Sequence, residues 1–271
     1  MSRLSVKDKV NQFKKILRPS VYDYIPLLFT AFTELHGDRY FGDDPAIVGG
    51  IAFLDSMPVT VIAQARGRNI EEFIKTNNAQ PQPEGYRKAL RLAKQAEKFR
   101  RPVICLIDTP GAYPGAGAEE RGQGEAIARN LYEFMMLKIP VISIVLGEGG
   151  SGGALALGVC DELAMLESAL YSVISPRGCA SILWKDSSRE MEAAELLKIT
   201  AEDMLALGIC DRIISETEDG VQIDVRKTAS NIAAWMRDAL RRLSMADPET
   251  LPEKRYQKFR RIGVCGNTGG T

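Results

Sequence analysis

The stretch V-L-G-E-G-G-S-G-G-A-L-A-L-G, residues 145–158, places six glycines around one serine. An apolar run at 141–146 precedes it and predicts a buried strand, and the small apolar residues at 154–159 predict a short helix. Because glycine has no Cβ, the backbone N–H groups of such a turn are open to a ligand, and the helix dipole adds partial positive charge there. The stretch therefore predicts an anion-binding turn between a strand and a helix.

Two known motifs also fit this stretch. G-x-S-x-G carries a nucleophilic serine, here Ser151, but hydrolases of that type need a later histidine, and the single histidine is His36. A serine–lysine pair stays open, and the simpler interpretation is that Ser151 caps the helix through its hydroxyl. Residues 147–152 fit the dinucleotide pattern G-x-G-x-x-G, with Glu167 as the acidic partner, but the helix that follows is too short for a crossover between parallel strands.

A second glycine-rich loop, T-P-G-A-Y-P-G-A-G at 109–117, follows the predicted strand 103–107. Asp108 and the next three residues resemble the D-x-x-G loop of GTPases, but the chain has no Gly-Lys pair, which excludes a phosphate-loop NTPase. Since the carboxyl ends of parallel strands meet at one edge, we expect both loops to face one cleft. One amide aimed at a developing oxyanion contributes about 3 kcal/mol to catalysis. The alternative is that the glycines only permit tight packing.

The remaining pattern alternates between strands and helices, which predicts an α/β fold with a mainly parallel sheet. Two β-rich runs around a turn at 55–58 predict a hairpin. The predicted helices are 4–17, 24–35, 83–99, 119–137, 154–159, 191–197, 201–207 and 229–243, and the predicted strands are 47–54, 59–63, 103–107, 141–146, 163–166, 170–174 and 210–214. We predict N-terminal helices at 1–35, one domain at 36–243 and a basic tail at 244–271.

Composition narrows the class of protein. The chain has 35 Lys plus Arg and 35 Asp plus Glu among 271 residues, so no global field attracts nucleic acid or an anionic membrane. Its five cysteines show no C-x-x-C spacing, which indicates a reduced compartment and no metal site in this chain. The N-terminus is rich in charge, which argues against a signal peptide, and the weakly polar stretch 140–159 is too rich in glycine for a membrane span. We expect a soluble, cytoplasmic protein.

Several longer motifs carry a resemblance. They are DTPGAYPG at 108–115 continuing through AEERGQGEAIARNL at 118–131, GEGGSGGALALG at 147–158, YSVISP at 171–176, GCASILWKD at 178–186, ELHGDR at 34–39 and PEGYRKALRLAKQAEKF at 83–99. Together they resemble the alpha subunit of bacterial acetyl-CoA carboxylase carboxyltransferase. The likeness runs from about residue 21 to residue 263, including the tail RYQKFRRIG at 255–263, and motifs of this length are highly specific.

The resemblance implies a crotonase-like (ClpP/crotonase) fold, a spiral of ββα units, here with N- and C-terminal helical extensions. It implies transfer of carboxylate from carboxybiotin, tethered to its carrier protein, to acetyl-CoA, a coenzyme A thioester, giving malonyl-CoA for fatty acid biosynthesis. The implied partners are a zinc-ribbon beta subunit that completes the active site, the biotin carboxyl carrier protein and biotin carboxylase, with an alpha2-beta2 heterotetramer as the expected assembly. The family's zinc belongs to the beta subunit, consistent with the missing C-x-x-C here.

The same resemblance implies which backbone amides serve the reaction. Loss of CO2 leaves negative charge on the ureido oxygen of biotin, and the freed nitrogen can take the acetyl proton, so oxyanion holes matter more than a histidine. We expect these amides among Gly149, Gly150, Gly152 and Gly153. Biotin-binding amides are expected from the facing loop, at Gly115 and Ala116.

Two segments depart from the family pattern. Residues 77–83 (NNAQPQP) replace a stretch similar to Asn-Phe-Gly-Met, and Arg177 stands where the family usually has glutamate. Both departures bear on which acyl-CoA the active site accepts. A second hypothesis is a stand-alone crotonase-fold hydratase, isomerase or decarboxylase, in which Glu119, Glu120, Glu125 and Glu148 are candidates for a carboxylate pair. A third hypothesis is a non-catalytic scaffold.

Overall fold

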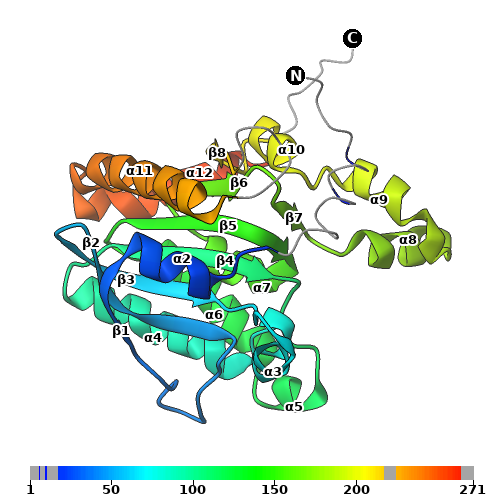
Figure 1. The fold of residues 1–271 in the computed structure, drawn as a ribbon, viewed down its shortest axis with the longest axis horizontal. Coiled ribbons are helices and arrows are strands. Elements are labelled where there is room, and N and C mark those ends of the chain that lie inside the picture. Colours follow the sequence, from blue (N-terminus) through cyan, green and yellow to red (C-terminus); the bar gives the residue numbers. More distant parts are fainter. Residues whose placement is uncertain (1–5, 7–9, 11–17, 217–223, 264–271) are drawn as a thin grey trace.

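In the computed structural model, which describes residues 6, 10, 18–216 and 224–263, eight strands form one sheet (Figure 1). The order is β1-β2-β3-β4-β5-β6-β8, and β7 pairs with β5 beside that path. The strands are β1 (Thr30–Glu34), β2 (Ile47–Leu54), β3 (Met57–Gln64), β4 (Val103–Thr109), β5 (Val141–Gly150), β6 (Glu162–Leu166), β7 (Leu170–Ser172) and β8 (Arg212–Ile214). Pairing is antiparallel from β1 to β3 and parallel from β3 to β8. The sequence predicts the β2–β3 hairpin and the mainly parallel sheet, but not β1.

Helices cover both faces of the sheet (Figure 1). On one face α4, α6 and α7 contact one another, and on the other α2 contacts α11. The helices are α2 (Val21–Leu28), α3 (Ile70–Lys75), α4 (Pro83–Lys98), α5 (Ala116–Glu120), α6 (Gln123–Met135), α7 (Ser151–Gly158), α8 (Pro176–Trp184), α9 (Glu190–Leu197), α10 (Ala201–Ala206), α11 (Val225–Ser244) and α12 (Leu251–Arg261), with short 3-10 helices at Asn77–Ala79, Ser187–Arg189 and Pro248–Thr250. The predicted helix 4–17 lies almost entirely outside the described residues, and the predicted boundaries at 35 and 243 stay a prediction.

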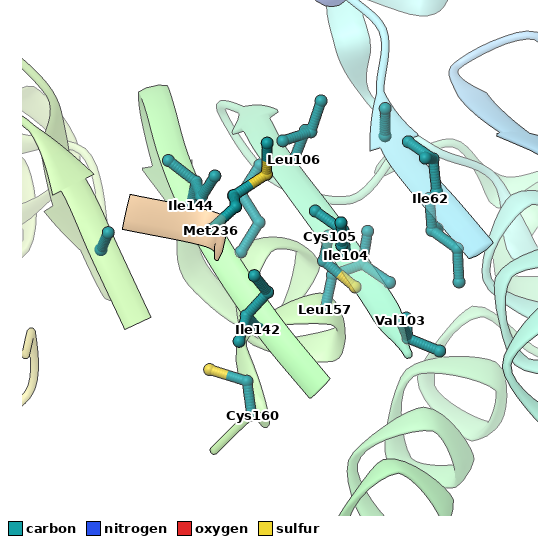
Figure 2. Close-up of a cluster of buried hydrophobic side chains, with 14 of the residues drawn as sticks. Ile62, Val103, Ile104, Cys105, Leu106, Ile142, Ile144, Leu157, Cys160 and Met236 are labelled. Carbon is teal, nitrogen blue, oxygen red and sulfur yellow. The ribbon is translucent and has the colours of Figure 1, made fainter. Parts of the chain in front are cut away.

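The core lies between these layers. Every residue of β4 is buried, which explains its continuous apolar sequence, because a strand covered on both faces has no solvent side. Figure 2 shows Ile104 and Leu106 of β4 and Ile142 and Ile144 of β5 in one cluster with Met236 of α11. Buried apolar side chains thus fix β4 and β5, and with them the point where each strand ends.

The predicted helix 24–35 is wrong in its second half. The helix α2 begins earlier, after Ser20, whose side chain forms a capping box with Asp23, and it ends at Leu28. Residues 30–34 instead form β1, an edge strand antiparallel to β2. An added Cβ at Gly50 would collide with the carbonyl of Thr33, so this glycine allows the close approach of the two strands. Pairing to a neighbouring strand has overridden a local helical pattern.

The predicted helix 119–137 is divided in two. Helix α5 ends at Glu120, and α6 begins at Gln123 after Gly122, whose φ of +84° is left-handed and cannot continue a helix. Helix α8 and the C-terminal helix α12 were not predicted. In contrast, the predicted hairpin is confirmed, with a tighter turn in which Leu54 already pairs with Met57.

The predicted basic tail contains a helix, α12, with one fully buried arginine. Arg255 of α12 is 1% exposed, and its guanidinium donates to the carbonyls of Phe134, Met135, Leu137 and Ile139. It also forms an ion pair with Asp161 at 2.9 Å. This arginine therefore joins α12 to the end of α6 and to the start of β6.

Candidate active site

The glycine turn between β5 and α7 has the shape of an elbow. Strand β5 continues to Gly150, further than predicted, because its last residues pair with β7. Helix α7 begins at the next residue, Ser151, whose φ of +55° is left-handed, and Ser151 is exposed. Its N-cap is Gly150, with no side-chain hydrogen bond to the first turn. The prediction that the Ser151 hydroxyl caps the helix is therefore wrong, since the residue lies inside the helix rather than before it.

The four candidate glycines differ in what surrounds them. An added Cβ would collide with the Tyr171 ring at Gly149 and with the Pro110 carbonyl at Gly150. At Gly153 it would lie 2.5 Å from the Ala112 nitrogen. Packing alone thus explains three of the glycines. At Gly152 the only contact is with Ile127, at an ordinary 3.6 Å, so packing does not explain this glycine.

The second glycine loop packs against the turn before α7, whereas the expectation that both loops face one cleft stays a prediction. The contacts of Gly150 and Gly153 are with Pro110, Gly111 and Ala112, directly after β4. The Thr109 hydroxyl accepts from the Gly111 N–H at 3.0 Å and donates to its carbonyl at 2.8 Å, which shapes this loop. The structure therefore brings residues 110–112 to the start of α7.

Gly115 and Ala116 lie further along the same loop. Gly115 is the N-cap of the short helix α5, and Ala116 is its first residue. An added Cβ at Gly115 would collide with the ring of Tyr113, so packing explains this glycine as well. Their assignment as biotin-binding residues stays a proposal.

A cavity of about 510 Å³ opens beside the start of α7. Its lining is mostly apolar and includes Ser151, Gly152 and Leu155 from α7, Tyr171 from β7, and Phe259 and Ile262 from the C-terminal end of the chain. A larger cavity of about 660 Å³ lies beside β8 and α11, away from both glycine loops, and Asp211, Asp238 and Arg242 line it. We take the smaller cavity as the candidate site because it alone of the two borders the uncapped helix start.

The candidate carboxylates are paired or exposed. Arg66 bonds Glu148 at 3.0 Å and lies 3.4 Å from Asp108, and Asp108 accepts from the Glu148 N–H. Burial lowers the pKa of Arg66, but the charges of Asp108 and Glu148 outweigh it and raise the pKa, so this cation stays charged. Glu119, Glu120 and Glu125 are exposed on α5 and α6. This arrangement does not favour the carboxylate pair that a hydratase needs.

The start of α4, the motif PEGYRKA, braces the second loop. Glu84 is 3% exposed and pairs with Arg87 and Arg121. Arg121 in turn donates to the Gly117 carbonyl at 2.7 Å. The pattern of these residues predicts the helix 83–99 but carries no local signal for this supporting role.

The segment 77–83, which departs from the family pattern, is part of the same support. Its residues Asn77, Asn78 and Ala79 have positive φ values. The Pro81 carbonyl accepts from the Tyr113 N–H at 3.0 Å and from Gln123 Nε2 at 2.9 Å. The departure thus lies beneath the second loop, whereas Arg177 is exposed at the start of α8.

Asp44, beneath the start of α4, predicts a pH effect on stability. Burial raises the pKa of Asp44 to about 6, against the lowering effect of hydrogen bonds from the Ala46 and Gln82 N–H groups. Between about pH 4 and 6 the folded chain therefore holds a proton that the unfolded chain has lost, and stability falls by about 2 to 3 kcal/mol as pH rises through this window.

The Asp44→Asn variant should lack this part of the pH dependence, which urea unfolding at pH 4.5 and 7.5 measures. Asp43 does not confound the comparison. Burial raises its pKa, but hydrogen bonds from Lys88 and the Gly37 N–H prevail and lower the pKa to about 2, below the window. Parallel pH profiles for the variant and the wild type would contradict the assignment.

Other site classes find no support in the part of the chain that the structure describes. Among those residues, no group of three or more His, Cys, Asp or Glu side chains is placed to hold a metal ion. None of the described helices combines the length and apolar character needed to cross a bilayer. Cys105, Cys160, Cys179 and Cys210 are buried free thiols. Cys265 lies outside the described residues.

Comparison with known proteins finds the same family by a family model and by individual relatives. A family model described as acetyl co-enzyme A carboxylase carboxyltransferase-like matches residues 1–263. The acetyl-coenzyme A carboxylase carboxyl transferase subunit alpha of Geobacillus sp. (strain WCH70) is 56% identical over 262 residues, which is 97% of this chain and 81% of that protein. The subunit of the same name from Clostridium acetobutylicum is 58% identical over 246 residues, 91% of this chain and 90% of that protein.

A solved structure shows the fold. Transcarboxylase 12S, crystallised as a hexamer with methylmalonyl-coenzyme A and methylmalonic acid bound, superposes with a TM-score of 0.67 at 20% identity over 96% of this chain. This chain spans only 45% of that longer chain. The prediction of a crotonase-like fold is confirmed.

Proposed function

This chain belongs to the acetyl-CoA carboxylase carboxyltransferase-like family, and we propose from that premise that the α7 turn stabilises the anion formed in carboxyl transfer. The chain is the alpha subunit of such a carboxyltransferase. The proposed reaction moves carboxylate from carboxybiotin to the methyl carbon of acetyl-CoA. One observation carries the proposal: an uncapped, glycine-lined helix start opens onto an apolar cavity.

The residues present fit a biotin group. Carboxybiotin would supply the activated carboxyl group, and amides of this turn would stabilise the negative charge left on its ureido oxygen by the release of CO2. The N–H groups of the first turn of a helix have no partner within the helix, and here the N-cap residue, Gly150, has no side chain that could cap them. We assign Gly152 and Gly153 as the donors. The mostly apolar walls from Leu155, Tyr171 and Phe259 limit water, which strengthens each donor.

Gly149 and Gly150 have a different part in the proposed site. They lie on β5 in register with Tyr171 and Ser172 of β7. Their lack of a side chain lets the strand end against β7 and against the second loop, which sets the direction of α7. Gly115 and Ala116 are proposed as further amides for the biotin group, at the far end of that loop.

The proposal extends to partners. The name alpha subunit implies a partner subunit and a hetero-oligomer. We propose a zinc-ribbon beta subunit that binds the thioester and completes the site, with the biotin carboxyl carrier protein and biotin carboxylase as the other components. An alpha2-beta2 arrangement in the cytoplasm is the proposed assembly.

The test is co-purification with a zinc-ribbon beta chain, followed by parallel assays of malonyl-CoA formation and crotonyl-CoA hydration. We expect carboxyl transfer from the complex only, and no hydration by the lone chain, because the carboxylates near the site are paired with Arg66. Hydratase activity of the lone chain would overturn the proposal in favour of a stand-alone crotonase-fold enzyme.

A further inference from the structure

The first turn of α7 lacks the usual means of holding a helix start. Ser, Thr, Asp and Asn are the preferred residues at a helix N-cap, where the side chain accepts one of the first N–H groups. Such a cap would consume the donors that the proposed site needs. Gly152 and Gly153 have wide conformational freedom, so the turn gains little stiffness from its own residues. The turn must be held in another way.

Hydrogen bonds to the carbonyl oxygen of Gly153 hold the first turn of α7. The carbonyl oxygen of Gly153 accepts from Gln64 Nε2 at 2.8 Å and from the Tyr86 hydroxyl at 3.3 Å. Gln64 is the last residue of β3, Tyr86 lies in the first turn of α4, and both are fully buried. Two separate elements therefore converge on one oxygen atom of α7.

The hydrogen bonds from Gln64 and Tyr86 can both fix the direction of the Gly153 carbonyl. Burial raises the pKa of Tyr86 well above its usual value, so the hydroxyl stays protonated and can donate. The peptide unit is planar, so a fixed carbonyl also fixes the plane that joins Gly153 to Ala154. Because Gln64 and Tyr86 bind an acceptor, they leave the N–H groups of the turn free.

We infer that Gln64 and Tyr86 are positioning residues that align the first turn of α7 through the Gly153 carbonyl and keep its amides available to an anion. This inference rests on the proposed function of that turn. It also gives the motif PEGYRKA a role, since Tyr86 is the residue of this motif that reaches α7.

The test uses Tyr86→Phe and Gln64→Met in the chain assembled with its beta subunit. Both variants keep the side-chain volume, and the Oε1 atom of Gln64 is buried without a hydrogen-bond partner among the described residues, so methionine also removes an unsatisfied acceptor. We expect kcat to fall about three-fold for Tyr86→Phe and about ten-fold for Gln64→Met, whose bond is shorter, with KM for acetyl-CoA unchanged. The double variant should fall by less than the product, because both residues act through one oxygen.

Ser143→Ala is the matched control. Ser143 on β5 is fully buried, and its hydroxyl donates to the Leu157 carbonyl at 2.7 Å, near the other end of the same helix. This variant also removes one buried hydrogen bond to α7, so its melting temperature should fall as much as that of Tyr86→Phe. Its kcat should stay at the wild-type value, because the first turn is untouched.

The outcomes distinguish failure of the positioning role of Gln64 and Tyr86 from failure of the proposed function. If Tyr86→Phe and Gln64→Met keep the wild-type kcat, or if Ser143→Ala lowers kcat to the same extent, the two residues have only a structural role and the inference is wrong. If the wild-type complex transfers no carboxylate, the proposed function fails before any variant is compared.

Discussion

Replacing Gly152 with valine is expected to lower carboxyl transfer by about 100-fold, the size of the loss when one oxyanion donor is removed. Among the described residues, the added Cβ comes within 4 Å of Ile127 alone, at an ordinary 3.6 Å, so the fold accommodates this first carbon. The Cα–Cβ bond of a helical residue leans toward the helix N-terminus, which places the new atoms on the side from which an anion approaches. The melting temperature should stay at or near the wild-type value, because glycine is a poor helix former.

Gly124→Val is the matched control for this substitution. Gly124 also lies in the first turn of a helix, α6, and an added Cβ there meets nothing within 4 Å. It is exposed, away from the cavity, so its variant should keep full activity. Full turnover by Gly152→Val in a folded complex would contradict the proposed role of the turn.

Substitution of Gly150 or Gly153 is less informative. An added Cβ at either position collides with the backbone of the second loop, so loss of activity would follow from loss of structure. The scaffold hypothesis therefore cannot be tested at these two positions. It is tested at Gly152, which packing does not restrict.

Replacing Arg255 with methionine is expected to lower the free energy of unfolding by about 4 kcal/mol. The substitution leaves four carbonyl oxygens without their buried donor and leaves the Asp161 carboxylate without its cation. Urea unfolding of the purified chain measures the change. Activity should fall as well, because α12 carries Phe259, which lines the cavity beside α7.

Arg260→Met is the control for this prediction, since Arg260 is exposed on the same helix. Its free energy of unfolding should change by less than about 0.5 kcal/mol, as expected for a surface substitution. A second variant that combines Arg255→Met with Asp161→Asn should recover part of the loss, because it removes the unpaired buried charge. Equal free energies of unfolding for Arg255→Met and Arg260→Met would show that Arg255 does not hold α12 against the rest of the chain.

Local patterns predicted the elements whose sequence reflects their own burial. The hairpin β2–β3, strands β4 and β5 and helix α4 follow from alternation, continuous apolar runs and helical spacing. The glycine-rich turn before α7 was also predicted, because an apolar strand that is followed by several glycines and small apolar residues is typical of a tight turn into a helix. These elements contain the glycine-rich turn, whereas most of the cavity wall beside it comes from residues 155–209 and from Phe259 and Ile262.

The elements that were missed depend on contacts between distant residues. Residues 30–34 pair with β2 although their sequence continues a helical pattern, and β5 is lengthened by β7. The role of Arg255 in the basic tail also has no local signal, because it binds carbonyls more than a hundred residues away. No local signal identifies Gln64 and Tyr86 either, since both act on Gly153 only after the chain has folded.

The most direct test of the central claim is a crystal structure of the alpha–beta complex with biotin bound. We expect the nitrogen atoms of Gly152 and Gly153 to lie about 2.7 to 3.2 Å from the ureido oxygen, the range of N–H to O hydrogen bonds. Binding of that oxygen by side chains or by the beta subunit alone, with the first turn of α7 facing elsewhere, would contradict the proposed role of the turn.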